Sequence, residues 1–139
     1  MTVTNHTAAL LGALRTCLIA VPGLPASRAW ENVTYLPTTD VPYVEDSWLG
    51  GPEEAAALGN ELFRGTYLYQ ISLVWPINVG VHEPLKMADK IADAMRGTTL
   101  TIAGSGHPGR VVGVRVGPRI QSTANWYTLP ITVSILMDF

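Results

Sequence analysis

The sequence predicts an α+β fold in which two helices pack on a mixed, largely antiparallel sheet. Segments in which apolar and polar residues alternate recur along the chain and predict strands. Two other segments place apolar residues at helical spacing, and Pro and Gly separate the segments. The expected order of elements is α-β-β-β-α-β-β-β. The chain has 139 residues, so residues 1–139 are expected to form a single domain with a long loop at residues 50–65.

The first part of the chain is expected to form a helix and then a hairpin. A broad apolar face predicts a helix over residues 5–20, which a Pro-Gly-Leu-Pro run ends. Residues 28–36 and 43–49 have the pattern of strands, and the turn-forming residues 37–40 predict that these strands pair as a hairpin. Residues 50–65 follow no regular period, and connections of this length are usually functional or mobile.

A strand followed by a helix forms the centre of the predicted fold. Residues 67–76 alternate, with aromatic and branched side chains on one side, which predicts a strand with one well-buried face. The turn-forming residues 76–80 end this strand. A helix is expected over residues 84–96, with one apolar and one charged face, and Gly97 suits its C-terminal cap. We expect this helix to lie across the buried face of the strand.

Three more strands are expected in the last third of the chain, over residues 98–103, 110–116 and 127–139. Residues 119–125 are interpreted as a polar connection. The last strand alternates most regularly. Pro130 cannot donate a backbone hydrogen bond, so it predicts an edge strand or a bulge near the start of that strand.

The composition favours a protein that buries much of its surface in an assembly. Charged residues make up 14% of the chain, against roughly 25% in typical soluble domains. Lys and Glu are depleted at protein interfaces, and Lys86 and Lys90 are the only lysines. The alternative is a small domain with a Thr-rich surface. The formal net charge of −2 gives no indication of an electrostatic nucleic-acid binder.

Targeting and membrane signals are not apparent in the sequence. Residues 10–21 are apolar, but Arg15 interrupts them and the segment is too short to span a bilayer. No basic segment precedes them as in a signal peptide, so a cytoplasmic origin is expected. Cys17 is the only cysteine, which rules out an intramolecular disulfide, and we interpret it as a core residue.

No catalytic, cofactor-binding or metal-binding residue is predicted. His6, His82 and His107 show no metal-ligand spacing. The glycine-rich residues 104–109 lack the Lys-Ser/Thr ending of a phosphate loop and precede a strand. Glu45 and Asp46 are adjacent in a strand, so their side chains should point to opposite faces and not share a site. One alternative is a small α+β enzyme that uses His82 or His107 with a carboxylate.

Residues 66–97 resemble the tail terminator proteins of long-tailed bacteriophages, also called tail completion or head–tail joining proteins. The resemblance rests on the strand, the Pro-Ile-Asn-Val-Gly turn at residues 76–80 and the Ala-Asp-Lys-Ile-Ala run at residues 88–92. The order of elements fits over most of the chain. The resemblance implies a structural virion protein without catalytic residues, made in the bacterial host cytoplasm and located in the tail at the head–tail junction.

The same resemblance implies a set of partners. Family members form a homohexameric ring that caps the head-proximal end of the tail tube, stops tube polymerisation and presents a surface to the head or neck connector protein. Genomic DNA passes through the lumen without specific binding, and no membrane is involved. The alternative within the virion is another neck component, such as a stopper or adaptor.

The candidate interface residues lie mainly in the expected loop. Leu62, Phe63 and Arg64 are expected to anchor the loop on the tail tube or on a neighbouring subunit. Replacing Phe63 with Ala should then leave the monomer folded and weaken assembly. The full set of candidates adds two steering carboxylates, an exposed tryptophan and a loop histidine: Trp48, Glu53, Glu54, Leu62, Phe63, Arg64 and His107.

Overall fold

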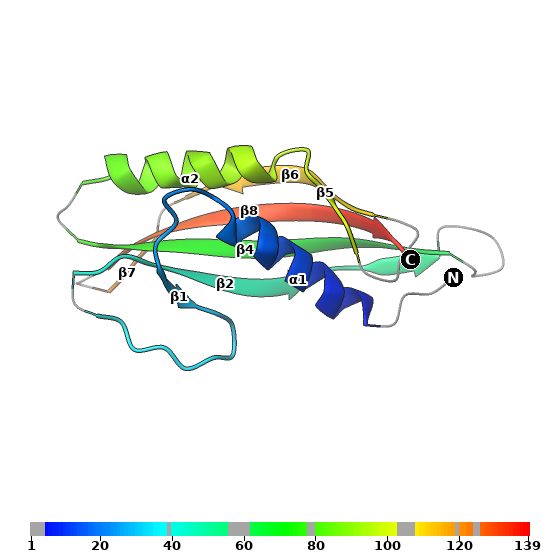
Figure 1. Ribbon diagram of the computed structural model, residues 1–139, viewed down its shortest axis with the longest axis horizontal. Helices are drawn as coiled ribbons and strands as arrows, with labels where there is room; N and C mark the ends of the chain where they lie inside the picture. The colour runs from blue at the N-terminus through cyan, green and yellow to red at the C-terminus, as the bar shows by residue number, and fades with distance from the viewer. Residues whose placement is uncertain are drawn as a thin grey trace.

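The computed structural model describes residues 5–38, 40–55, 62–77, 80–102, 108–118, 120–123 and 126–139. In these residues both helices lie on one face of an elongated sheet (Figure 1), which confirms the predicted α+β class. The elements are α1 (His6–Ile19), β1 (Ser27–Ala29), β2 (Tyr43–Gly50), β3 (Glu53–Ala55), β4 (Phe63–Pro76), α2 (His82–Met95), β5 (Thr99–Leu100), β6 (Gly109–Val116), β7 (Ile120–Thr123) and β8 (Trp126–Asp138).

The sheet is built around β4 and β8, which pair along almost their whole length, from Arg64 opposite Asp138 to Pro76 opposite Trp126. The strand order is β1-β2-β4-β8-β6-β5, with β3 added to β4 and β7 added to β8. Every pair is antiparallel except β1 with β2, which is parallel.

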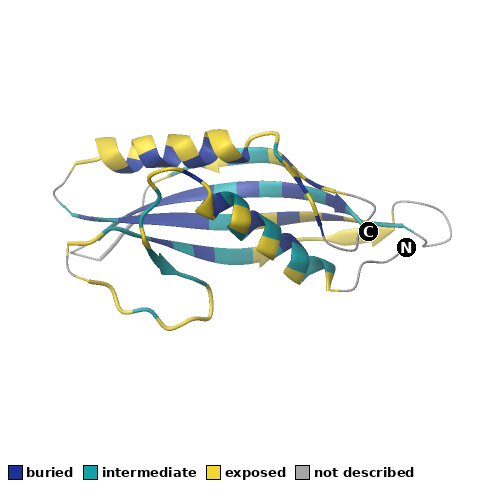
Figure 2. Ribbon diagram, in the orientation of Figure 1, coloured by how far each residue is buried: buried dark blue, intermediate teal, exposed yellow. Residues whose placement is uncertain are grey.

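The core lies between the sheet and the two helices (Figure 2). Alternate residues of β4 and β8 point toward the helices, as the period of residues 67–76 predicts. Three leucines of α1 and the apolar face of α2 cover them, and each fully buried side chain of this size contributes about 1.5–3 kcal/mol. The fully buried side chains include Leu10, Leu14, Leu18, Tyr69, Ile71, Leu73, Ile91, Met95, Ile131, Val133 and Ile135.

The predicted first hairpin is wrong. Only Ser27–Ala29 forms a strand, and it runs parallel to β2. After β1 the chain turns, since the Trp30 carbonyl accepts from the Val33 N–H at 3.0 Å and Asn32 has a φ of 62°. The Glu31 N–H donates to a carboxylate of β2 instead of a ladder carbonyl. Residues 30–36 therefore leave the sheet instead of pairing antiparallel.

The expected loop at residues 50–65 is also wrong in part. Glu53–Ala55 forms β3, which pairs with the first residues of β4, and residues 56–61 lie outside the described residues. The chain can fold back closely here because of its glycines. A Cβ on Gly51 would overlap the carbonyl oxygen of Thr66, and one on Gly65 would overlap the phenol of Tyr67.

The strand that contains Pro130 is central, so the predicted edge strand is wrong. The alternative, an irregularity near the start of that strand, is present in the pairing of β7 with residues 126–128 of β8. The Gly117 N–H donates to the Pro130 carbonyl at 2.8 Å. The N–H and C=O of one strand residue point to the same side, so the missing N–H of Pro130 faces the junction between β6 and β7. No bond to β4 is lost. Residues 120–123, expected in a polar connection, form β7 on that side of β8.

Candidate assembly interface

A buried carboxylate holds α1 and the segment after β1 against β2. The Asp46 side chain is fully buried and accepts from Arg15 Nε at 2.6 Å and Nη2 at 3.1 Å. The Tyr69 hydroxyl and the Glu31 N–H also donate to it, both at 2.8 Å. The Arg15 guanidinium lies 5.0 Å from the ring centre of Trp30. We call these groups the Asp46 network.

The ionisation of the Asp46 network follows from these contacts. Burial alone would raise the pKa of Asp46, but the hydrogen bonds from Arg15, the Glu31 N–H and Tyr69 together lower it. Burial, and then the Asp46 carboxylate, raise the pKa of the Tyr69 hydroxyl. Glu45 points to the opposite face, as predicted, and burial raises its pKa. The network is thus a structural ion pair with every carboxylate oxygen bonded.

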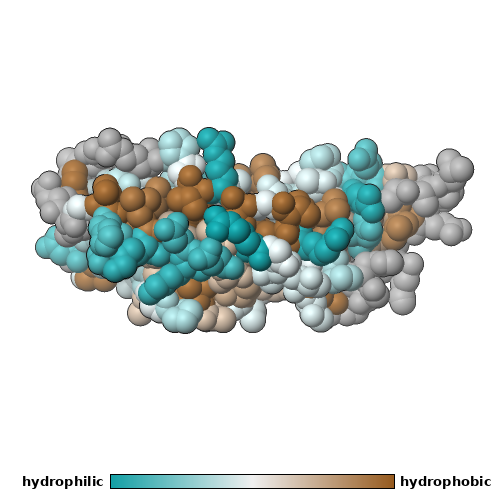
Figure 3. Space-filling view, turned by 90° about the horizontal axis from the view of Figure 1, so that it is seen from above, coloured by the Kyte–Doolittle hydropathy of each residue, from teal (hydrophilic) through white to brown (hydrophobic). Residues whose placement is uncertain are grey.

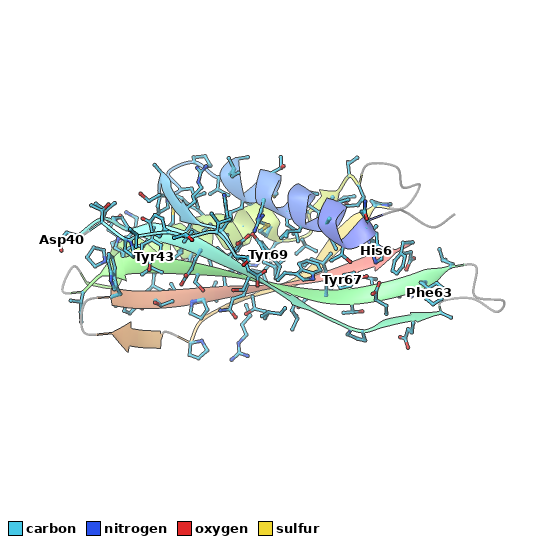
Figure 4. All side chains as sticks on the ribbon, turned by 90° about the horizontal axis from the view of Figure 1, so that it is seen from below. His6, Asp40, Tyr43, Phe63, Tyr67 and Tyr69 are labelled. Atoms are coloured by element: carbon cyan, nitrogen blue, oxygen red, sulfur yellow. The ribbon has the colours of Figure 1, made fainter. Side chains whose placement is uncertain are left out.

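Near the start of α1, residues 53–55, 63–66 and 136–139 lie side by side as β3, the start of β4 and the end of the chain, and the start of β6 pairs on the other side of β8. We call these three segments the arm. Figure 4 shows Phe63 in this arm, with His6 and Tyr67 on the side of the helices. His6 Nε2 lies 2.8 Å from Glu53 Oε2, and the Tyr67 hydroxyl donates to the same oxygen at 2.7 Å. These bonds attach α1 to the arm, and the one from Tyr67 contributes most to lowering the pKa of Glu53.

Phe63 and Arg64, two predicted anchors, make contacts within the arm. Phe63 exchanges both backbone hydrogen bonds with Phe139 at 2.8 Å, and its ring stacks on that of Phe139 with centroids 6.0 Å apart. Arg64 makes a bidentate pair with Asp138, at 2.7 and 3.0 Å. Phe63→Ala would therefore remove packing within the monomer as well as any contact with a partner.

The other predicted interface residues fall in several places. Leu62 is half-buried and directly precedes β4, and Glu54 is exposed on β3 opposite Arg64. Trp48 is half-buried, because its ring packs against Tyr67 with centroids 5.4 Å apart. His107 lies outside the described residues. Glu53 and Glu54 were both predicted to be steering charges, but their side chains lie on opposite faces of β3.

The two long edges of the sheet differ in how they are covered. On one edge, β1 pairs with residues 43–45 of β2, and a Glu31 carboxylate oxygen accepts the Trp48 N–H of β2 at 3.0 Å. On the other edge, β5 pairs only with the start of β6. In the part of the chain that the structure describes, no strand pairs with the outer side of β6 at residues 112–116. Val112 is 57% exposed there. Figure 3, which faces α2 and this edge, shows a hydrophobic band bordered by hydrophilic side chains.

Sequence reasoning missed this edge and the two exposed arginines beside it, Arg110 and Arg115. The signal available was a valine-rich run with two arginines in residues 110–116, which predicts a strand but does not identify its neighbours. The Asp46 network was missed too, because its members are distant in sequence.

The described residues offer little for chemistry. No group of three or more His, Cys, Asp or Glu among them could hold a metal ion. His82 is exposed at the start of α2, and the other histidine of the enzyme alternative lies outside the described residues. Neither described helix is long and apolar enough to cross a membrane.

Comparisons with known proteins identify the family. A family model described as phage tail terminator protein matches residues 6–135. A chain from the virion of a native gene transfer agent particle is similar, with a TM-score of 0.67, 19% identity, and coverage of 99% of this chain and 100% of that chain. A second solved structure, without a descriptive name, has a TM-score of 0.65, 18% identity and 98% coverage of both chains. No curated protein matches. The chain belongs to the phage tail terminator family and is a structural protein of the virion tail.

Proposed function

We propose that the protein forms a closed homohexameric ring on the head-proximal end of the tail tube. The ring stops tube polymerisation and presents the attachment surface for the head or neck. The observation that carries this proposal is the family match over residues 6–135. The outer side of β6, which no described strand covers at residues 112–116, supports it, because strand edges left open in soluble proteins are sites of pairing with another chain.

The sheet has two different edges, and this difference favours a ring over a two-fold dimer. On one edge, β1 and the Glu31 carboxylate cover β2, and β3 continues the edge beyond the end of β2. The other edge presents the outer side of β6, with Val112 exposed. A contact between unlike surfaces repeats head to tail and generates a ring when the rotation closes. The formal net charge of −2 also suits a lumen through which DNA passes without specific binding, since phosphate affinity depends on Lys and Arg.

The proposal is tested by adding the purified protein to polymerising tail tube protein. Tubes should stop growing, and electron microscopy should show a ring on one end of each tube. Light scattering over a concentration series gives the mass of the free protein, which is 15.0 kDa for one subunit. A protein that leaves tube growth unchanged and binds only to the neck connector would overturn the terminator role in favour of a stopper or adaptor.

A further inference from the structure

On the outer side of β6, backbone groups without a strand partner among the described residues recur in a defined pattern. The Gly117 N–H bonds to β8, and successive strand residues direct their backbone groups to alternate sides. The backbone groups of Arg115 therefore also face β8, and those of Val114 and Val116 face outward. The side chains of Val114 and Val116 pack on the core, so Arg115 points to the face of the sheet without helices.

The strand β3 has the matching pattern. The Thr66 N–H donates to the Pro52 carbonyl at 3.0 Å, so by alternation Glu54 directs its backbone groups toward β4. The backbone groups of Glu53 and Ala55 then face away from β4. The Glu53 side chain lies on the helix side, where it bonds to Tyr67, so Glu54 points to the face without helices.

From these two patterns we propose that β3 of one copy pairs antiparallel with β6 of the next copy, so that the sheet continues from subunit to subunit. The register places Val114 opposite Ala55, Arg115 opposite Glu54, and Val116 opposite Glu53. This proposal rests on the proposed ring and names the two edges that form it.

Charge and orientation both support a second copy as the occupant. Arg115 is exposed and has no ion pair within the described part of the chain, and Glu54 is exposed on an acidic strand. The register brings these opposite charges together on one face of the sheet. Opposite charges directly across two strands are favourable, whereas like charges there are destabilising. The proposed pairing also satisfies strand direction, because β3 is already antiparallel to β6 within one subunit.

The position of the two edges fits closure. In one subunit β3 is level with the start of β6, since both lie beside the end of β8. Pairing of β3 with residues 114–116 of a neighbour therefore staggers consecutive copies along the strand direction. Closing a sheet into a barrel requires a stagger of this kind.

Disulfide trapping tests the pairing. In a Cys17→Ser background, we combine Glu54→Cys with Arg115→Cys and oxidise the protein with and without tail tubes. Directly opposed strand residues have Cα atoms about 4.5–5.5 Å apart, which suits a disulfide. Within one subunit the two positions lie about 14 Å apart across the sheet, because β4 and β8 separate them, and roughly 20 Å apart along the strands, because they lie level with Asp138 and Thr132 of β8. This separation is too large for a disulfide within one subunit. The matched control combines Glu54→Cys with Arg110→Cys instead of Arg115→Cys. Arg110 lies on the same strand as Arg115, at a position that β5 covers.

The expected result is a ladder of covalent multimers for the Glu54/Arg115 pair, lost on reduction and absent from the Glu54/Arg110 control. No ladder, or an equal ladder from both pairs, while the Cys17→Ser parent still caps tubes, overturns the pairing and leaves the proposed function standing. A parent that neither caps tubes nor forms a ring counts against the proposed function, and the pairing falls with it.

Discussion

Replacing Asp46 with Asn should destabilise the monomer strongly. The substitution keeps the size of the side chain and removes its charge, so Arg15 loses its ion pair and the buried Tyr69 hydroxyl loses a charged acceptor. Removing one partner of a buried pair costs about 3–5 kcal/mol. Arg15 is 27% exposed and can regain water, so we expect the low end of this range, about 3 kcal/mol. In a domain of this length that corresponds to a fall in Tm of about 12 °C.

The assay is urea unfolding followed by tryptophan fluorescence, with Glu45→Gln as the matched control. Glu45 is the adjacent carboxylate, it is half-buried, and it has no hydrogen bond to a described residue. Because burial raises the pKa of Glu45, its charged form is disfavoured in the folded state. The control should therefore be neutral or slightly stabilising at pH 7, opposite in sign to Asp46→Asn.

The pH dependence separates the ion pair from general packing. The folded pKa of Asp46 is lowered, so its stabilisation is complete above the unfolded pKa of about 3.9 and is lost as the pH falls through the folded value. The difference in the free energy of unfolding between the wild type and Asp46→Asn should become smaller as the pH falls. A gap that keeps the same size at pH 3 and pH 7, or a loss no larger than that of Glu45→Gln, would refute the role given to the network.

The remaining predictions concern the arm and the proposed interface. Gly51→Ala should lower the free energy of unfolding by about 1–3 kcal/mol, because the added Cβ overlaps a main-chain carbonyl. Gly12→Ala, in the open middle of α1, should raise it by about 0.5–1 kcal/mol. Urea unfolding measures both variants, and equal effects on the free energy of unfolding would contradict the overlap at Gly51. Glu53→Gln should lower the free energy of unfolding at pH 7, and this loss should shrink as the pH falls below the unfolded pKa of about 4.3, since the folded pKa of this carboxylate is lowered and its contribution is lost as the pH falls through that value. Glu54→Arg and Arg115→Glu should each abolish tube capping, and the double variant should restore it; no restoration would count against their pairing.

The elements that show a regular spacing of apolar residues were predictable from the sequence. The alternation over residues 67–76 correctly assigns Tyr69 and Ile71 to the buried face, and helical spacing locates both helices. The pairing of the strands was harder to predict from the sequence, because contacts between distant segments decide it. Residues 28–36 look like half of a hairpin, yet their path is set by the Glu31 N–H bonding to a carboxylate of β2.

The arm shows a second limit of local reasoning. Glu53–Ala55 has a composition of low strand propensity. It becomes a strand because β4 extends beyond the end of β2 and offers it an edge, and because Gly51 lets the chain approach closely. The predicted interface residues illustrate the same point. No partner for Phe63 or Arg64 within the monomer is apparent from the sequence. In the folded arm they contact Phe139 and Asp138, which lie at the far end of the chain.

Monomer stability and the direction of assembly are linked through one edge of the sheet. Asp46 binds the Glu31 N–H, and this bond holds the Glu31 carboxylate where it accepts the Trp48 N–H on the edge of β2. The buried network that stabilises α1 therefore also blocks β2 from pairing with another chain. Since natural sheets avoid unwanted pairing by covering their edges, covering β2 restricts pairing on this side of the sheet to β3, and the two edges that remain for assembly, β3 and β6, are unlike. A ring requires this property, because a subunit with two open, similar edges could also form closed dimers.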